Sequence, residues 1–262
     1  MTVIATRRVA TAQCRGLYNT SRFNEAEVRD LLANGAAQLF RGADLLSETG
    51  NARSYRVHVA GTAYFAKQVL LRGWHRLADR LWQPSVYGCY HAAGRLLAAG
   101  LRTPPPILAA IVAHEGQRQP VLVTDFCAEA EELDAFAQHH PELHRELIPE
   151  LADLLAEFHH RGFYSRHLRS ANLLVQLLHG QRLYWFIDLE RMGSSRWWPR
   201  RAFRSTVSRA CADLFPHLTP TDRQFLLTTC FDRALKRNLY TRPSQLEDFL
   251  ARTRGEIARR QD

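Results

Sequence analysis

The sequence predicts an α+β protein with two lobes, a small β-rich N-terminal lobe and a helical C-terminal lobe. Three observations indicate this division. Apolar and polar residues alternate from Arg53 to Leu70 around Gly61-Thr62, as they do in a β-hairpin. From Leu143 to Phe158 the apolar residues recur instead with the 3.6-residue period of a buried helix. The change between the two patterns predicts a short hinge near Thr124 to Glu129.

Composition describes a folded protein with a strongly basic surface. The 262 residues are 46% hydrophobic and 23% charged, which excludes a disordered chain. The formal net charge of +9 favours anionic partners without choosing among them. Among the 35 cationic residues only Lys67 and Lys236 are lysines, so a retained lysine is a candidate for a role that needs a compact ammonium.

The N-terminal lobe is predicted over residues 41–126, after a helical extension over residues 1–40. Asn24 can cap a helix that runs to about Phe40. The alternating pattern predicts a hairpin whose second strand carries Lys67. We then expect a short helix over Trp74 to Leu81, a longer one over Ser85 to Ala99, and strands over Ile107 to Val112 and Pro120 to Asp125.

The helical C-terminal lobe is predicted over residues 127–262. Its core element is the long amphipathic helix from Glu142 to His160. We expect, around it, a short helix over Glu131 to Ala137, an irregular loop over Phe163 to Ala171, a hairpin of Leu173 to Gln176 with Leu183 to Ile187, and final helices from about Arg201 and Pro220.

Asn172 and Asp188 are the candidate cation ligands. They lie 16 residues apart, one before and one after the predicted second hairpin, so their oxygens can converge. One neutral and one charged oxygen ligand suit Mg²⁺ when water and phosphate fill its remaining positions. Lys67 can supply positive charge to the phosphates of the same nucleotide. Singly, the first two residues would be turn caps and Lys67 a solvated strand lysine; the joint spacing favours a site.

Several segments share their order with a known family: Lys67 on a strand, Ala99-Gly100-Leu101 before Thr103-Pro104, Leu122-Val123-Thr124, Asn172-Leu173-Leu174-Val175, and Ile187-Asp188-Leu189. In these features the chain resembles the lipopolysaccharide kinase (Kdo/WaaP) family over roughly Leu45 to Leu227. The resemblance implies a protein-kinase-like fold and transfer of phosphate from ATP to Kdo or heptose of the lipopolysaccharide core. Proteins labelled toluene tolerance proteins are similar over Trp74 to Pro106.

The resemblance also implies roles for individual residues. It places Lys67, Asn172 and Asp188 on ATP, with Asn172 and Asp188 on Mg²⁺. The kinase loop H-R-D-L-x-x-x-N becomes Ser165-Arg166-His167-Leu168-Arg169-Ser170-Ala171-Asn172, so His167 stands where the catalytic Asp is expected. His167 would then lie nearest the acceptor hydroxyl, whose proton an imidazole can accept.

Three departures from the kinase pattern leave an alternative open. The helix that usually pairs with the strand lysine has no acidic residue from Val86 to Gly100. Glu190 replaces the Gly of D-F-G, and no glycine-rich loop precedes Lys67. The alternative is therefore a pseudokinase that binds nucleotides or partners in envelope maintenance.

Arg166 and Arg169 are further candidates for the catalytic group. They would either bind phosphate or pair with acids such as Glu157.

Partners and compartment follow from composition and from the segment Arg191 to Arg209. This run of Arg and Trp predicts contact with an anionic saccharide-lipid acceptor or with the inner-membrane surface. Nucleic-acid binding is the weaker reading, since no motif for it accompanies the run. Five cysteines without a C-x-x-C pair, no apolar leader over Met1 to Ala12, and no apolar run of membrane-spanning length predict a cytoplasmic protein.

The sequence thus predicts an ATP-dependent, Mg²⁺-requiring phosphotransferase. We therefore expect Lys67, Asn172 and Asp188 to meet in the cleft between the two lobes.

Overall fold

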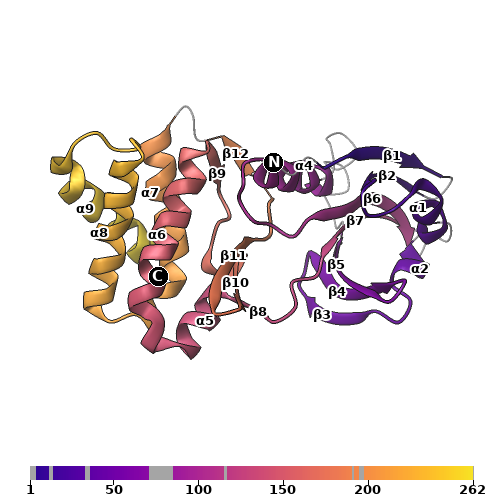
Figure 1. Ribbon diagram of the computed structural model, residues 1–262, viewed down its shortest axis with the longest axis horizontal. Helices are drawn as coiled ribbons and strands as arrows, with labels where there is room; N and C mark the ends of the chain where they lie inside the picture. The colour runs from indigo at the N-terminus through magenta and orange to yellow at the C-terminus, as the bar shows by residue number, and fades with distance from the viewer. Residues whose placement is uncertain are drawn as a thin grey trace. The chain divides into compact units, whose positions relative to one another are not determined.

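The computed structural model describes residues 4–11, 14–32, 36–70, 85–114, 117–190, 192–194 and 198–261 (Figure 1). The chain forms two compact units, Met1–Ala128 and Glu129–Asp262. The predicted short helix over Trp74 to Leu81 lies outside the described residues.

The first unit contains a seven-stranded antiparallel sheet. Its strands lie in the order β1-β2-β6-β7-β5-β4-β3, and Figure 1 shows them curving around a common interior. The strands are β1 (Thr6–Ala10), β2 (Cys14–Asn19), β3 (Asp44–Glu48), β4 (Ala52–Val59), β5 (Thr62–Val69), β6 (Pro106–His114) and β7 (Gln117–Asp125).

Alternation along the strands gives this sheet two apolar faces. On one face, Val57 of β4 and Ala66 of β5 join a core that α1 (Glu25–Leu32) and α2 (Ala36–Leu39) cover. On the other face, Leu122 of β7 packs against α4 (Ser85–Ala98). The predicted hairpin and the long helix after it are therefore present, and α4 covers the face of the sheet opposite to α1 and α2.

The two strands β1 and β2 correct the prediction of a purely helical extension over residues 1–40. β2 pairs with β6 along its length, and Gly16 lies opposite Ala110. A Cβ atom on Gly16 would lie 2.6 Å from the carbonyl oxygen of Ala109, so only glycine fits this approach. Burial of β2 comes from this distant strand, which no local pattern reveals.

The second unit combines five helices of the described chain with short strands. β10 pairs with β11 and β8, and β12 pairs with β9. The elements are β8 (Ala130–Glu132), α5 (Leu133–His139), η1 (Pro141–Leu143), α6 (His144–His160), β9 (Phe163–Ser165), η2 (Ser170–Asn172), β10 (Leu173–Leu178), β11 (Gln181–Phe186), β12 (Met192–Ser194), α7 (Pro199–Leu214), η3 (Phe215–His217), α8 (Pro220–Lys236), η4 (Pro243–Gln245) and α9 (Leu246–Gln261).

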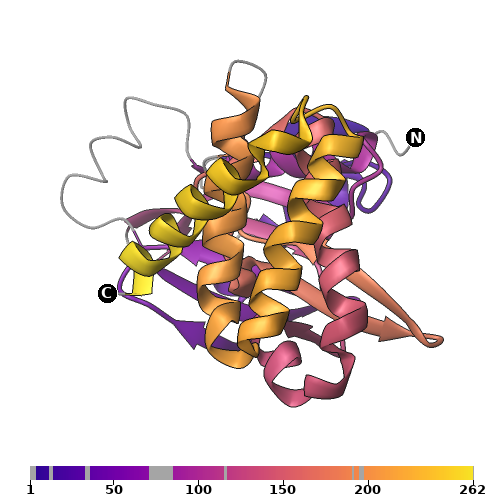
Figure 2. The ribbon, with the colours of Figure 1, turned by 90° about the vertical axis from the view of Figure 1, so that its left-hand side faces the viewer.

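Aromatic side chains hold the helices of this unit together. Phe158 of α6 stacks on Phe186 of β11 with ring centroids 4.9 Å apart. Phe203 of α7 stacks on Phe249 of α9 at 6.1 Å. Figure 2 shows α9, in yellow, lying across α7, which it contacts along much of its length. The sequence analysis did not predict α9 as a separate helix.

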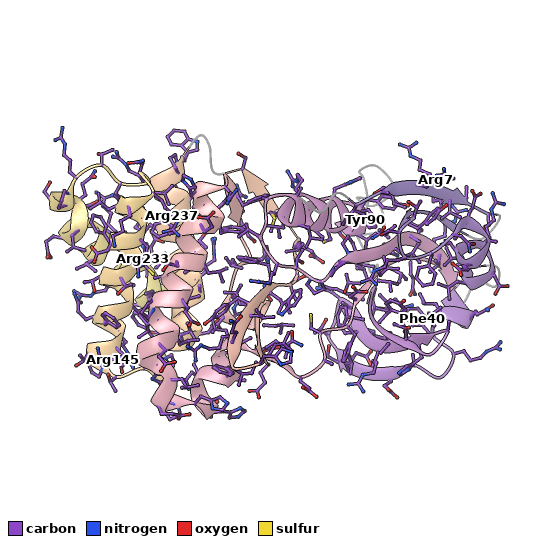
Figure 3. All side chains as sticks on the ribbon, viewed as in Figure 1. Arg7, Phe40, Tyr90, Arg145, Arg233 and Arg237 are labelled. Atoms are coloured by element: carbon purple, nitrogen blue, oxygen red, sulfur yellow. The ribbon has the colours of Figure 1, made fainter. Side chains whose placement is uncertain are left out.

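Ion pairs join α6 to α8. Arg233 and Arg237, labelled in Figure 3, reach the Asp153 carboxylate at 3.0 and 3.1 Å. Arg237 also contacts Glu157 at 3.0 Å. Because these side chains are partly exposed, we assign each pair no more than about 1 kcal/mol of stability.

Within the described ranges, no helix combines the length and the apolar character that crossing a bilayer requires.

Candidate functional site

The hairpin of β10 and β11 brings Asn172 and Asp188 to the same end of one element. Leu173 lies opposite Phe186 in the register of the two strands. One step further out, the N–H of Ile187 donates to the carbonyl oxygen of Asn172 at 3.0 Å. The 16 residues between Asn172 and Asp188 are thus folded back, and both residues flank the open end of the hairpin.

The side chain of Asn172 is oriented by the loop before it. Its Nδ2 donates a hydrogen bond to the backbone carbonyl of His167 at 2.5 Å. The amide nitrogen is therefore engaged, and the oxygen Oδ1 is the atom left to accept a hydrogen bond or to ligate a cation.

Asp188 combines an exposed side chain with an unusual backbone. Its φ of 52° lies in the left-handed region, which residues other than glycine rarely occupy. Aspartate tolerates this conformation better than most residues, at a cost on the order of 1 kcal/mol. Five non-glycine residues of the described chain have a positive φ, and among them Asp188 is the one at the candidate cation site.

The donor set fits a cation that brings other ligands with it. One amide oxygen and one carboxylate match the few protein ligands that Mg²⁺ takes when phosphate and water complete its shell. Within the described ranges there is no group of three or more His, Cys, Asp or Glu side chains that could hold a metal by itself. A metal held by these two oxygens would take its remaining ligands from water and phosphate.

The loop before Asn172 holds His167 at the surface. Ser165, which is buried, accepts a hydrogen bond on its Oγ from the N–H of His167 at 3.1 Å. Leu168 is buried on the other side of His167, while Arg166 and His167 themselves are exposed. The buried neighbours fix the backbone, so the imidazole is presented on an anchored loop.

Arg169 forms an ion pair with Asp213, which the sequence pattern had not suggested as its partner. Its guanidinium donates to both oxygens of Asp213, at 2.8 and 3.1 Å, and Ser170 Oγ donates to the same carboxylate at 3.2 Å. The hydrogen bond from Arg169 holds the pKa of Asp213 below its usual range. This geometry gives Arg169 an anchoring role.

Two sequence features bear on this pairing. Asp213 is the only acidic residue of α7, a signal that was available in the sequence. Glu157, the acid suggested for these arginines, instead contacts Arg161 at 2.6 Å and Arg237 at 3.0 Å.

Lys67 belongs to the first unit. On β5 it lies between Ser54 of β4 and Leu122 of β7. Since Leu122 packs on the α4 side of the sheet, Lys67 lies on that face and is half-buried. α4 itself contains no carboxylate. The convergence of Lys67 with Asn172 and Asp188 stays a prediction.

A β-sheet unit followed by a helical unit, with the loop and hairpin just described, is a protein-kinase-like arrangement. The sequence model of the lipopolysaccharide kinase (Kdo/WaaP) family matches residues 45–209. The chain therefore belongs to the lipopolysaccharide kinase (Kdo/WaaP) family. Membership in a kinase family implies ATP as the phosphate donor.

Two solved structures are similar to this chain. The chain is similar to WaaP in complex with acyl carrier protein, with a TM-score of 0.59, 21% identity, and coverage of 82% of this chain and 88% of that chain. It is also similar to the PknI kinase domain of Mycobacterium tuberculosis, with a TM-score of 0.44, 15% identity, and coverage of 82% and 94%. No curated protein matches the sequence.

Proposed function

We propose that the protein transfers phosphate from ATP to a hydroxyl of a lipopolysaccharide-core sugar, Kdo or heptose. The observation that carries this proposal is a pair of hydrogen bonds that tie the His167 loop, Asn172 and the end of β11 to one another. Asn172 and Asp188 flank the open end of the hairpin, and the side-chain amide of Asn172 donates to the backbone carbonyl of His167. Membership in the lipopolysaccharide kinase family supports the choice of acceptor.

Asn172 Oδ1 and the Asp188 carboxylate are the proposed ligands of Mg²⁺. The metal would neutralise charge on the nucleotide phosphates. Lys67 is the proposed phosphate contact from the first unit, as a compact point charge. The protein's own contribution is then positioning and charge, which is the main part of catalysis in phosphoryl transfer.

His167 is the proposed proton acceptor for the attacking hydroxyl. Its ring is exposed and therefore accessible to an acceptor, while its backbone is fixed through Ser165. Arg166, exposed beside it, supplies positive charge near the acceptor. A core acceptor would be met at the cytoplasmic face of the inner membrane, so we propose a cytoplasmic protein with a peripheral membrane contact.

A pseudokinase role is the second candidate, and particular residues favour it. His167 stands in the place of the catalytic carboxylate, and α4 offers no acidic residue to the strand lysine. In this case the chain keeps nucleotide or partner binding for envelope maintenance without transferring phosphate.

Phosphate transfer to isolated core oligosaccharide separates the two candidates. The purified protein is incubated with Mg-ATP and oligosaccharide from a strain lacking the gene, and added phosphate is measured by mass spectrometry. We expect one phosphate per acceptor with wild type and none with Asp188→Asn. Nucleotide binding without transfer would support the pseudokinase and reject the kinase. Wild-type phosphate content in the deletion strain's core would also contradict the kinase.

A further inference from the structure

Two adjoining cavities lie along one side of α7 in the second unit. The larger, about 710 Å³, is lined by residues of β9, the loop after it, β12 and α7, among them Tyr164, Arg166 and Arg209. The smaller, about 370 Å³, is lined by α7 and α9, among them Arg259 and Arg260. Both cavities are lined by Arg201 and Ser205, so they form one continuous groove. The arginine groove is defined here by Arg166, Arg201, Arg209, Arg259 and Arg260.

Helical periodicity places the groove along a single stripe of α7. Arg201, Ser205 and Arg209 follow one another at intervals of four residues, which puts them on one face of the helix. The stripe spans about 12 Å along the helix axis. Arg201 and Arg209 therefore mark the two ends of this stripe, with Ser205 between them.

Five arginines and one carboxylate, that of Glu256, line the groove, so positive charge is in excess there. Within the described ranges none of the five arginines forms an ion pair. The one acidic lining residue, Glu256, is already bonded to Arg204 at 2.9 Å and accepts a hydrogen bond from Ser208 at 3.0 Å. Arg209 also has a buried Nη1 with no hydrogen-bond partner. Buried donors without partners are costly, so the groove has unmet capacity for an acceptor.

The pKa shifts of Tyr164 and Arg260 agree with an excess of positive charge in the groove. Burial would raise the pKa of Tyr164, but the Arg209 guanidinium and the Ser205 hydroxyl outweigh it and lower that pKa. Burial and the nearby charges of Arg209 and Arg259 lower the pKa of Arg260, although the Glu256 carboxylate acts in the opposite direction. Arg209 and Arg260 thus interact although they line different cavities, which brings both parts of the groove into one electrostatic field.

The chemistry of the lining selects the class of ligand. Guanidinium groups bind phosphate oxygens through paired, planar hydrogen bonds. Positive charge at both ends of an approximately 12 Å stripe suits two phosphate groups better than one. Trp198 lines the groove with 73% of its surface exposed, and its flat ring can cover the face of a sugar or similar scaffold.

We propose that the arginine groove binds a ligand carrying two phosphate groups on a saccharide-like scaffold. The groove includes Arg166, which the proposed function places near the acceptor, so this proposal deepens that function; binding to the groove requires neither nucleotide nor metal. Two sources share this chemistry: a free phosphorylated sugar, and phosphate headgroups at a lipid surface.

The test measures binding to full-length protein in the absence of ATP and Mg²⁺. Fructose 1,6-bisphosphate is the soluble probe with two phosphates, and glucose 6-phosphate is its single-phosphate counterpart. Phosphatidylcholine vesicles containing a minority of phosphatidic acid probe the lipid source. Calorimetry follows the sugars, and cosedimentation follows the vesicles.

A pair of double variants removes equal charge from the same two helices. Arg209→Gln with Arg260→Gln alters the groove, whereas Arg200→Gln with Arg252→Gln alters α7 and α9 outside it. Arg200 contacts Tyr240 and Thr241, and Arg252 contacts Asp248. Circular dichroism and melting temperature establish that each variant folds.

We expect the bisphosphate to bind wild type about tenfold more tightly than the monophosphate, and the groove variant to lose at least about tenfold in affinity. The control variant should keep most of the affinity. Vesicle binding lost only in the groove variant, without sugar binding, would support the proposal and assign the lipid source. Equal losses in both variants, or no binding of either probe to wild type, would overturn it. Because metal and nucleotide are absent, these outcomes are separate from failure of the kinase assay.

Discussion

Asn172 donates its side-chain amide to the backbone carbonyl of His167 at 2.5 Å. The carbonyl of the same residue accepts the N–H of Ile187, directly before Asp188. One asparagine therefore joins the loop that presents the candidate proton acceptor to the strand that presents the candidate metal ligand. Its two roles, bracing the loop and ligating a cation through Oδ1, can be separated by substitution.

Asn172→Asp keeps an oxygen at the ligand position but removes the donor to His167. We expect it to retain Mg-ATP binding and to lose about 1 kcal/mol of stability, the typical contribution of one hydrogen bond. Asn172→Ala should lose both. Urea unfolding and calorimetric titration measure the two effects. An Asn172→Asp protein as stable as wild type would show that the bond to His167 does not brace the loop.

Asp188→Gly should separate stability from function. Glycine adopts the positive φ of this position without cost, so the variant should gain up to about 1 kcal/mol in unfolding free energy while losing Mg-ATP binding. Asn238, with φ 59° after α8, provides the matched control. Asn238→Gly should gain stability and keep binding. Unchanged nucleotide affinity in Asp188→Gly would remove this residue from the site.

The Arg169–Asp213 pair should make stability depend on acidity. Arg169 lowers the pKa of Asp213 in the folded protein. The stability that the pair provides is therefore complete above about pH 4, the ordinary carboxyl pKa, and is lost as the pH falls through the lowered pKa. Asp213→Asn should cost about 1 kcal/mol at neutral pH, a modest figure because Arg169 is largely exposed. The difference from wild type should shrink below that range, as followed by melting temperature. A pH-independent difference would contradict the assignment.

His159 should add a second acid dependence at higher pH. Its ring is buried against Phe203 at 5.4 Å, and burial lowers its pKa to about 3. Because an unfolded histidine titrates near about 6.5, the stability that its neutral form provides is present above that value and is lost as the pH falls toward 3. His159→Phe keeps a ring and should flatten the melting-temperature curve over this range. The neighbouring exposed His160, changed to Gln, should leave the curve unaltered.

The sequence predicted those elements whose buried face is visible in their own pattern of apolar residues. The hairpin of β4 and β5, the helix α4 and the long helix α6 follow from alternation, a glycine stop and a 3.6-residue stripe. Strands β1 and β2 were missed because β2 pairs with the distant strand β6 and β1 pairs in turn with β2. The partner of Arg169 was missed because α7 folds back onto the loop, which sequence spacing alone does not show.

At the candidate site, too, only the features set by local sequence were predicted. The spacing of Asn172 and Asp188 placed them on a hairpin, and the register put both at its open end. The left-handed backbone of Asp188 and the orientation of the Asn172 amide had no sequence signal, since both arise from contacts made after folding.

Titration with Mg-ATP tests the central claim most directly. Calorimetry compares wild type with Asp188→Asn, which preserves shape and removes the charge, and with Asp232→Asn on the exposed surface of α8 as a matched control. We predict binding to wild type and to the α8 variant, with affinity at least about tenfold lower in Asp188→Asn. Equal affinity in all three proteins, or no binding to wild type, would contradict the account.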